Sequence, residues 1–350
     1  MSTTIPTIDL SPYLTTSDSN DPKKATVIAA IREACKTTGF FRITHHGVSP
    51  LLQSDLLTAA KHFFALPLAT KRRYIDTIAR KGYEEIGSQM LQQGTRPDIK
   101  ECYFVGAEPA MPKEPPYRPF EYPNIWPDAS VLPEAVFKEP ILKYHGAICE
   151  LARTIMEILV KGLEDDFPGL RSEKLLQDFC QEPCASLRLL RYPGPSAGGN
   201  GSMEKGKGQN IWVHRGEIVA GAHTDFGGIT LLLQDGNEGL QVLNRQGRNG
   251  DQGREGGQEA EAWVDVPSTP DAYVVNIGDM FERWTGGRYR STVHRVVNVC
   301  GRERYSVPFF YDGNLDFTVR PLDKDASLKE DGREVTVRGY LMKKFEEIYL

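Results

Sequence analysis

A series of short β-rich segments, separated by turn residues and by no helical segment, occupies much of the second half of the chain. Strands that follow one another without intervening helices usually pair antiparallel and close into a sandwich or a barrel, and the double-sheet jelly roll is one such fold. This half of the chain is therefore predicted to form a β-core. Its segments are Ser186–Tyr192, Ile229–Gln234, Leu240–Leu243, Trp263–Val266, Ala272–Ile277, Val293–Val299, Tyr305–Tyr311 and Asp316–Val319.

The first half has the periodicity of helices. Apolar residues recur every three or four positions in Ala25–Thr37, Leu51–Phe64 and Glu134–Leu163, and again at the end of the chain in Thr336–Tyr349, with Thr336 as its N-cap. We expect a mixed α/β fold: a jelly-roll core at 181–325, a mostly helical region at 1–180 packed on it, and a C-terminal helix in 326–350. The three regions are expected to form one structural unit.

Composition excludes several classes of protein. The 350 residues carry a net charge of −5, which gives no basic surface for nucleic acid, and no apolar run approaches the roughly 20 residues of a membrane span. The N-terminus lacks the pattern of a signal peptide, so a cytoplasmic protein acting on a small molecule is expected. The six cysteines show no C-x-x-C pairing, which favours free thiols over a zinc site. Two glycine-rich inserts, residues 194–210 and 245–261, are expected to be surface loops, and the first can act as a lid because it leads towards His223.

The segment Gly221–Gly228 contains the pair His223 and Asp225, and His294 follows 69 positions after the aspartate. Residues two apart on an extended chain project to the same face, so the pair can share one metal ion. Two histidines and one carboxylate form the facial triad of non-haem Fe(II) oxygenases. Spacing alone also allows a zinc hydrolase. The adjacent His45 and His46 point to opposite faces of an extended segment and are predicted to be structural.

Nine motifs in one order resemble the Fe(II)- and 2-oxoglutarate-dependent dioxygenases of the isopenicillin N synthase-like family. The β-half is most similar to the fungal branch that contains thymine hydroxylase and enzymes that tailor secondary metabolites. The motifs are Ile5–Asp9; Gly39–Phe41 with His46–Val48; Asp98–Tyr103 with Gly106; Trp126–Pro127; Arg188–Tyr192; Gly221–Asp225; Asn276–Asp279; His294–Val296; and Arg304–Ser306.

The resemblance implies a double-stranded β-helix (jelly-roll) core and a set of site residues. His223, Asp225 and His294 would bind iron, while Arg304, Ser306 and Tyr192 would bind 2-oxoglutarate. An arginine fork and a hydroxyl group suit a carboxylate. The sequence departs from many plant relatives at Leu190, where they carry an asparagine. Residues expected near the substrate are Lys100, Tyr103, Phe281, Trp284 and Phe310, whereas Arg188 and Asn276 are expected to be structural.

The reaction implied by the resemblance is the oxidation of a small organic metabolite by O2, with release of succinate and CO2. Hydroxylation is the expected outcome, and desaturation, epoxidation and rearrangement are open branches. Two alternatives stay open at this point. One is an Fe(II)/O2 oxidase that does not use 2-oxoglutarate, and the other is a catalytically silent binding module.

Overall fold

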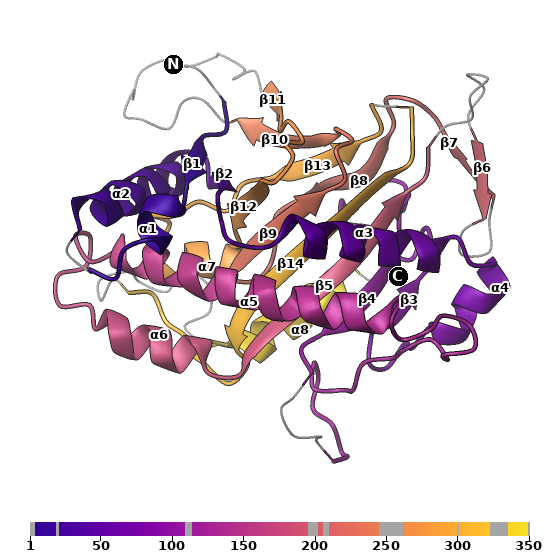
Figure 1. Ribbon diagram of the computed structural model, residues 1–350, viewed down its shortest axis with the longest axis horizontal. Helices are drawn as coiled ribbons and strands as arrows, with labels where there is room; N and C mark the ends of the chain where they lie inside the picture. The colour runs from indigo at the N-terminus through magenta and orange to yellow at the C-terminus, as the bar shows by residue number, and fades with distance from the viewer. Residues whose placement is uncertain are drawn as a thin grey trace.

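The structure is a computed structural model that describes residues 4–18, 21–108, 114–194, 202–205, 210–244, 262–299, 301–322 and 335–348. Its strands form two main sheets that face each other (Figure 1). The large sheet has eight strands in the order β1 (Thr7–Asp9), β2 (Phe40–Thr44), β12 (Tyr273–Ile277), β9 (Ile229–Gln234), β14 (Arg304–Asn314), β5 (Pro183–Tyr192), β4 (Glu101–Gly106) and β3 (Gly82–Glu84). The small sheet has four, in the order β11 (Ala262–Asp265), β10 (Leu240–Asn244), β13 (His294–Val297) and β8 (Ile218–His223).

Antiparallel pairing dominates both sheets, and this confirms the jelly-roll core expected from the sequence. The long strand β14 lies between β9 and β5, so the centre of the large sheet is built from the second half of the chain. The remaining strands form two separate hairpins: β6 (Ser202–Lys205) with β7 (Asn210–Val213), and β15 (Thr318–Val319) with β16 (Val335–Thr336).

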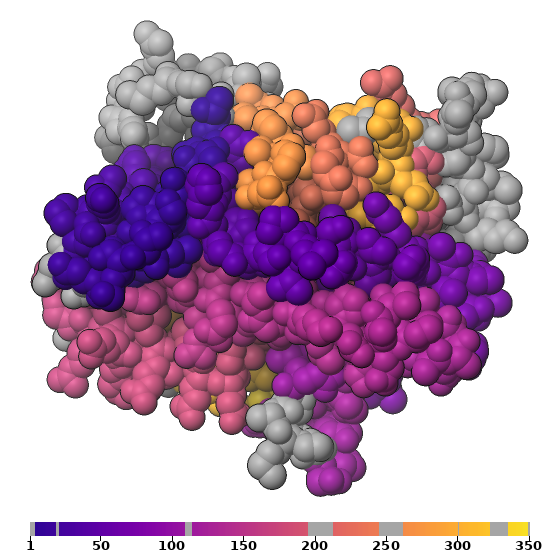
Figure 2. Space-filling view, in the orientation of Figure 1, coloured from indigo at the N-terminus to yellow at the C-terminus, as the bar shows by residue number. Residues whose placement is uncertain are grey.

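Helices cover the outer face of the large sheet. The space-filling view shows the purple and magenta segments as a continuous layer in front of the β-core (Figure 2). Two long helices of this layer, α3 and α5, lie side by side and contact β14 and β5. The helical segments are α1 (Ser11–Leu14), α2 (Pro22–Thr37), α3 (Pro50–Phe64), α4 (Leu68–Lys71), η1 (Arg72–Tyr74), α5 (Lys138–Lys161), α6 (Ser172–Cys180), α7 (Asp279–Trp284) and α8 (Val337–Ile348).

The amphipathic pattern of α5 explains why this layer adheres to the sheet. Its inward residues, among them Ile141, Ile148 and Ile155, are fully buried in one apolar cluster with Leu187 and Phe309 of the sheet. Burial of a large aliphatic side chain contributes about 1.5–3 kcal/mol each. The outer face of the large sheet is therefore covered by closely packed apolar side chains where α5 lies against it.

Region 1–180, expected to be mostly helical, also supplies strands β1 to β4 to the large sheet. Of these four, β3 and β4 escaped notice because β3 has three residues and β4 is buried on both faces, which removes the alternating pattern. The C-terminal helix begins as predicted, since the Thr336 hydroxyl accepts a hydrogen bond from the Gly339 N–H.

The first glycine-rich insert contains a β-hairpin rather than only a loop. The rest of that insert, residues 195–201 and 206–209, lies outside the described residues, as does the part of the second insert from 245 to 261. None of the helices in the described ranges combines the length and the apolar character needed to cross a membrane.

Candidate metal centre and adjoining pocket

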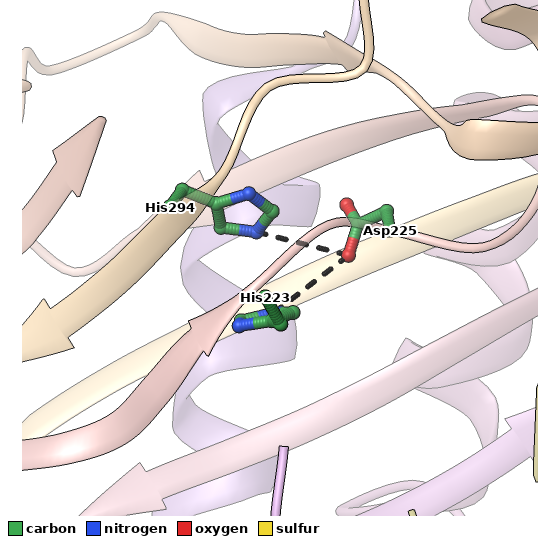
Figure 3. A group of neighbouring side chains, drawn as sticks. All are labelled: His223, Asp225 and His294. Atoms are coloured by element: carbon green, nitrogen blue, oxygen red, sulfur yellow. Dashed lines mark ion pairs between the residues drawn. The ribbon is translucent and has the colours of Figure 1, made fainter. Parts of the chain in front are cut away.

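The three residues of the predicted triad meet between the two sheets (Figure 3). His223 is the last residue of β8 and lies directly opposite His294 on the neighbouring strand β13. Asp225 follows two residues after β8, where the chain leaves the small sheet. Its Oδ1 lies 3.9 Å from His223 Nε2 and 3.7 Å from His294 Nε2. Their potential ligand atoms all lie within 4.8 Å of one another, close enough to share one metal ion.

Backbone carbonyl groups fix the orientation of both imidazoles. His223 Nδ1 lies 2.7 Å from the carbonyl oxygen of Gly221, and His294 Nδ1 lies 3.1 Å from that of Thr292. A carbonyl oxygen can only accept, so each Nδ1 carries the proton and each Nε2 presents a lone pair. Burial and the neighbouring His294 also lower the pKa of His223 to about 4. The imidazole of His223 is thus neutral at pH 7, the form that binds a metal.

Two side chains of the large sheet hold the other oxygen of Asp225. The Thr230 hydroxyl and the Asn276 amide donate hydrogen bonds of 2.6 Å and 2.7 Å to Oδ2, which leaves Oδ1 facing the histidines. Burial acts to raise the pKa of Asp225, but the two histidines and these hydrogen bonds together lower it. Asn276 was expected to be structural, and its hydrogen bond shows what that role is: its side chain orients Asp225, a candidate metal ligand. No sequence pattern pointed to Thr230, because its role depends on the pairing of separate strands.

A pocket borders the triad and extends between the sheets. The inward-facing residues of β14 and β5 line it at every second position, as strand geometry requires. On β14 these are Arg304, Ser306, Pro308, Phe310 and Asp312; on β5 they are Ser186, Arg188, Leu190 and Tyr192. The cavity is therefore continuous from the predicted 2-oxoglutarate residues past the triad.

Arg304 forms the core of a carboxylate receptor at one end of this pocket. Its Nη1 donates to the Ser306 hydroxyl over 3.1 Å and its Nη2 to Gln234 Oε1 over 2.9 Å, while the guanidinium lies 5.1 Å from the ring centre of Tyr192. Only 4% of Arg304 is exposed, and no carboxylate among the described residues forms an ion pair with it. A buried guanidinium of this kind matches a carboxylate brought by a ligand. Gln234 was not predicted.

The five residues expected near the substrate fall into two groups. Lys100 and Phe310 line the pocket, and Lys100 forms a buried ion pair with Asp98. Tyr103 does not line it, because it lies on the opposite face of β4, where its hydroxyl donates to the Ile125 carbonyl.

The expectation that Phe281 and Trp284 line the pocket is also wrong. Both belong to helix α7 and are buried in the main apolar cluster, where they contact each other and, in turn, Tyr289 and Phe179. In a short helix, no sequence pattern distinguishes an aromatic residue that lines a pocket from one that packs in the core.

Two charged pocket residues were not predicted to face a ligand. Arg188 was expected to be structural, and Asp312 was not singled out, yet both line the cavity and are at most 8% exposed. Burial raises the pKa of the Asp312 carboxyl group to about 7, because the charged form is poorly solvated there. Successive residues of a strand point to opposite faces of the sheet. Counting every second residue from Arg304 and Ser306 would therefore have placed Asp312 on the face that lines the pocket.

Comparisons with known proteins agree with the geometry of the site. Residues 5–129 match the family described as "non-haem dioxygenase in morphine synthesis N-terminal", and residues 208–313 match the "2OG-Fe(II) oxygenase superfamily". The chain is 37% identical over 348 residues to the 2-oxoglutarate-dependent dioxygenase citB of Monascus ruber, covering 99% of this chain and 95% of that protein. A 2-oxoglutarate-dependent dioxygenase of Didymella fabae is also 37% identical, covering 99% and 97%.

Solved structures give the same result for the whole fold. The chain matches full-length Neurospora crassa T7H in complex with alpha-KG at a TM-score of 0.76 and 26% identity, covering 98% of this chain and 96% of that one. The complex of the same protein with alpha-KG and thymine matches at a TM-score of 0.74. Sequence identity and coverage of this extent, from one end of the fold to the other, place the chain among the 2-oxoglutarate-dependent dioxygenases, whose reaction uses Fe(II), 2-oxoglutarate and O2.

Proposed function

We propose that His223, Asp225 and His294 bind the Fe(II) ion and that Arg304, with Ser306 and Tyr192, binds the distal carboxylate of 2-oxoglutarate. The observation that carries the proposal is the shared pocket: a buried arginine that forms no ion pair with a carboxylate in the described part of the chain lines the same cavity as three convergent metal-ligating atoms. This arrangement favours 2-oxoglutarate dependence over an Fe(II)/O2 oxidase that lacks the cosubstrate. An intact triad likewise argues against a silent binding module.

The residues of the chain have separable tasks in this reaction. O2 is the oxidant of this reaction: bound Fe(II) would activate it, and 2-oxoglutarate would supply two electrons as it is converted to succinate and CO2. The histidines offer neutral Nε2 atoms, Thr230 and Asn276 keep Asp225 in place, and Arg304 orients the cosubstrate. Asp225 and His294 are each only 8% exposed between the sheets, and such shielding protects a reactive site from side reactions.

The substrate proposed for this pocket is a small, mostly apolar organic metabolite. Five phenylalanines, Phe40, Phe104, Phe226, Phe310 and Phe345, line the cavity together with leucines of both sheets and the C-terminal helix. Hydroxylation is the outcome we expect, with desaturation, epoxidation and rearrangement as open branches. The cytoplasmic location expected from the sequence stays a prediction.

The test compares variants of the purified Fe(II) protein. Arg304→Leu should raise the KM for 2-oxoglutarate by about 100-fold or more, because a charged hydrogen-bonded pair contributes several kcal/mol, while Fe(II) binding is retained. His223→Ala should abolish Fe(II)-dependent succinate formation. Succinate is measured during a screen of small heterocycles and of aromatic and alkaloid-like metabolites.

The matched control is Arg302→Leu, which removes an exposed arginine two residues away. It should leave the KM unchanged. An unaltered KM in Arg304→Leu would reject the receptor, and full turnover in His223→Ala would reject the metal assignment.

A further inference from the structure

A second cavity, the outer cavity, adjoins the pocket at the triad, and its wall includes Lys81, Phe120 and Cys184. We propose that the substrate is an elongated carboxylic acid whose apolar part reaches the triad and whose carboxylate binds Lys81 in the outer cavity. This inference rests on the proposed function, because that function places Fe(II) at the triad and 2-oxoglutarate at Arg304.

The two cavities differ in size and share part of their walls. The pocket at the triad has a volume of about 130 Å³, and the outer cavity has about 980 Å³. Cavities that bind small organic ligands usually measure about 300–1,000 Å³. Phe104, Ser186 and Phe345 line both cavities. A substrate bound together with 2-oxoglutarate would therefore extend past these three residues into the outer cavity.

The ring of Phe345, on α8, lies at the boundary between the cavities. Its centre is 5.2 Å from the ring centre of Phe120, which lines the outer cavity. It is 6.5 Å from the ring centre of Phe226, which lines the pocket at the triad. Aromatic rings thus follow one another from one cavity to the other, and they match the apolar part of the proposed substrate.

The register of the strands gives a row of level residues across the large sheet. Gly106 of β4 pairs with Ser186 of β5, and Ser186 pairs with Phe310 of β14. Phe310 in turn pairs with Thr230 of β9, whose hydroxyl holds Asp225. Three strand spacings separate Gly106 from Thr230, roughly 14 Å in all. The row therefore runs from the outer cavity to a candidate metal ligand.

The ammonium group of Lys81 lies at the outer end of this row. A Cβ atom at Gly106 would be 2.8 Å from Lys81 Nζ, so the glycine gives the ammonium its space. Residues two apart on a strand face the same side, so this is the face on which Phe104 lines the pocket. Lys81 Nζ donates a hydrogen bond to the carbonyl oxygen of Tyr122. An ammonium has three N–H donors, and a carboxylate can accept from the others.

Lys81 differs in its charge partners from the other buried lysines in the described ranges. Lys71, Lys81 and Lys100 are each at most 7% exposed. Lys71 forms an ion pair with Glu101, over 2.6 Å. Lys100 forms one with Asp98. No carboxylate in the described part of the chain lies within ion-pair distance of Lys81, and burial lowers the pKa of its ammonium group to about 8. A buried charge without a counter-charge is costly, and the carboxylate of a ligand would provide one.

The acidic residues of the outer cavity leave its buried end cationic. Glu121 and Asp316 pair with Arg118, over 2.7 Å and 3.1 Å. Among the described residues that line this cavity, the buried charged side chain is that of Lys81. The remaining acidic residues of the wall are exposed to solvent: Glu108, Glu150, Glu182 and Glu346.

The experiment measures equilibrium binding of two matched probes to the protein loaded with Fe(II) and 2-oxoglutarate, without O2. The probes are 6-phenylhexanoate and its neutral analogue 6-phenylhexanamide. Saturating 2-oxoglutarate keeps Arg304 occupied, so that the acid cannot bind there. Calorimetry should show that the wild-type protein binds the acid at least about tenfold more tightly than the amide, as expected for a hydrogen bond between charged groups.

Lys81→Met should reduce the ratio of the two affinities to within about threefold, because methionine keeps an unbranched side chain and removes the charge. Gly106→Ala is a second test that retains the lysine. Its added methyl group must displace the ammonium, so the ratio should fall by at least about threefold. The matched control is Lys143→Met, which removes an exposed lysine of α5 and should leave the ratio unchanged. Circular dichroism checks the fold of each variant.

The orientation of the bound acid is measured by NMR with Mn(II) in place of Fe(II). Protons close to a paramagnetic ion relax faster than distant ones. The ring protons of 6-phenylhexanoate should therefore relax faster than the methylene protons beside its carboxylate.

Equal affinity for acid and amide in the wild-type protein, absence of binding of both probes, an unchanged ratio in either folded variant, or faster relaxation beside the carboxylate than on the ring overturns the proposal. A merely structural role of Lys81, as an anchor for Tyr122, would alter stability but not the ratio. Failure of the proposed function would appear differently, as loss of Mn(II) or 2-oxoglutarate binding in the wild-type protein, while the comparison with Lys81→Met still reports on Lys81.

Discussion

At the residue scale, the carboxylate of Asp225 shows how neighbouring side chains prepare a ligand. One oxygen faces the histidines, and the other accepts hydrogen bonds from Thr230 and Asn276. Both donors belong to the large sheet, whereas the histidines belong to the small sheet. The hydrogen bonds therefore fix the ligand geometry across the interface between the sheets.

Thr230→Val should weaken Fe(II) binding by about 10–100-fold, because the variant keeps the shape of threonine but removes the donor that orients Asp225. The measurement is the Kd for Fe(II) without O2, with circular dichroism as a check of the fold. Thr154→Val is the control, since that hydroxyl is exposed on α5 and bonds only its own helix. Equal Kd values in wild type and Thr230→Val would refute the positioning role.

At the scale of elements, a buried charge network joins three strands and a helix on the outer side of the large sheet. Glu101 of β4 accepts hydrogen bonds of 2.6 Å from Lys71 of α4, 2.6 Å from Tyr83 of β3 and 2.7 Å from Arg191 of β5. Glu101 is 1% exposed, so the network is almost completely shielded from water. It fixes the edge of the sheet that carries Lys100 and Phe104 into the pocket.

Glu101→Gln should lower the free energy of unfolding by about 3–5 kcal/mol, because the buried Lys71 then lacks its counter-charge and Arg191 retains only its ion pair with the more exposed Glu303. Denaturant titration measures the change. The comparison is Glu139→Gln, which breaks an exposed pair with Lys143 on α5 and should cost at most about 0.5 kcal/mol. A loss in Glu101→Gln no larger than in that control would contradict the argument.

The same elements show what sequence could and could not predict. Periodicity identified α2, α3, α5 and most strands of the core, because each has one consistent apolar face. The resemblance supplied the triad and the receptor, which keep a fixed spacing along the chain. The assignment of Tyr103, Phe281 and Trp284 to the pocket failed because the sequence does not distinguish an aromatic residue in the core from one in the wall of a cavity. Contacts between remote strands, such as Thr230 with Asp225, have no local signature.

At the scale of the whole molecule, the pocket carries a cost in stability that its function can explain. The carboxyl group of Asp312 is buried between the sheets, and its raised pKa means that the folded protein holds this proton more tightly than the unfolded chain. Residues that destabilise a fold yet line a ligand site are often retained for function. Asp316 shows the opposite shift in pKa. Burial acts to raise the pKa of its carboxyl group, but hydrogen bonding to Arg118 and the charge of Arg338 lower it.

These opposite shifts predict that the two variants differ in how their stability depends on pH in metal-free protein. With a pKa near 7 in the folded state and an ordinary value of 3.8, Asp312 leaves stability intact below about pH 4 and reduces it progressively as the pH rises to 7. Asp312→Asn removes this penalty, so its free energy of unfolding relative to wild type should rise by roughly 2 kcal/mol between pH 5 and pH 8. Asp316→Asn should show no such trend, since that carboxyl group stays ionised throughout the range. After metal is removed with a chelator, denaturant titrations at pH 5 and pH 8 measure the free energy of unfolding of each variant relative to wild type. The same pH dependence in Asp312→Asn and Asp316→Asn would show that burial does not control the ionisation of Asp312.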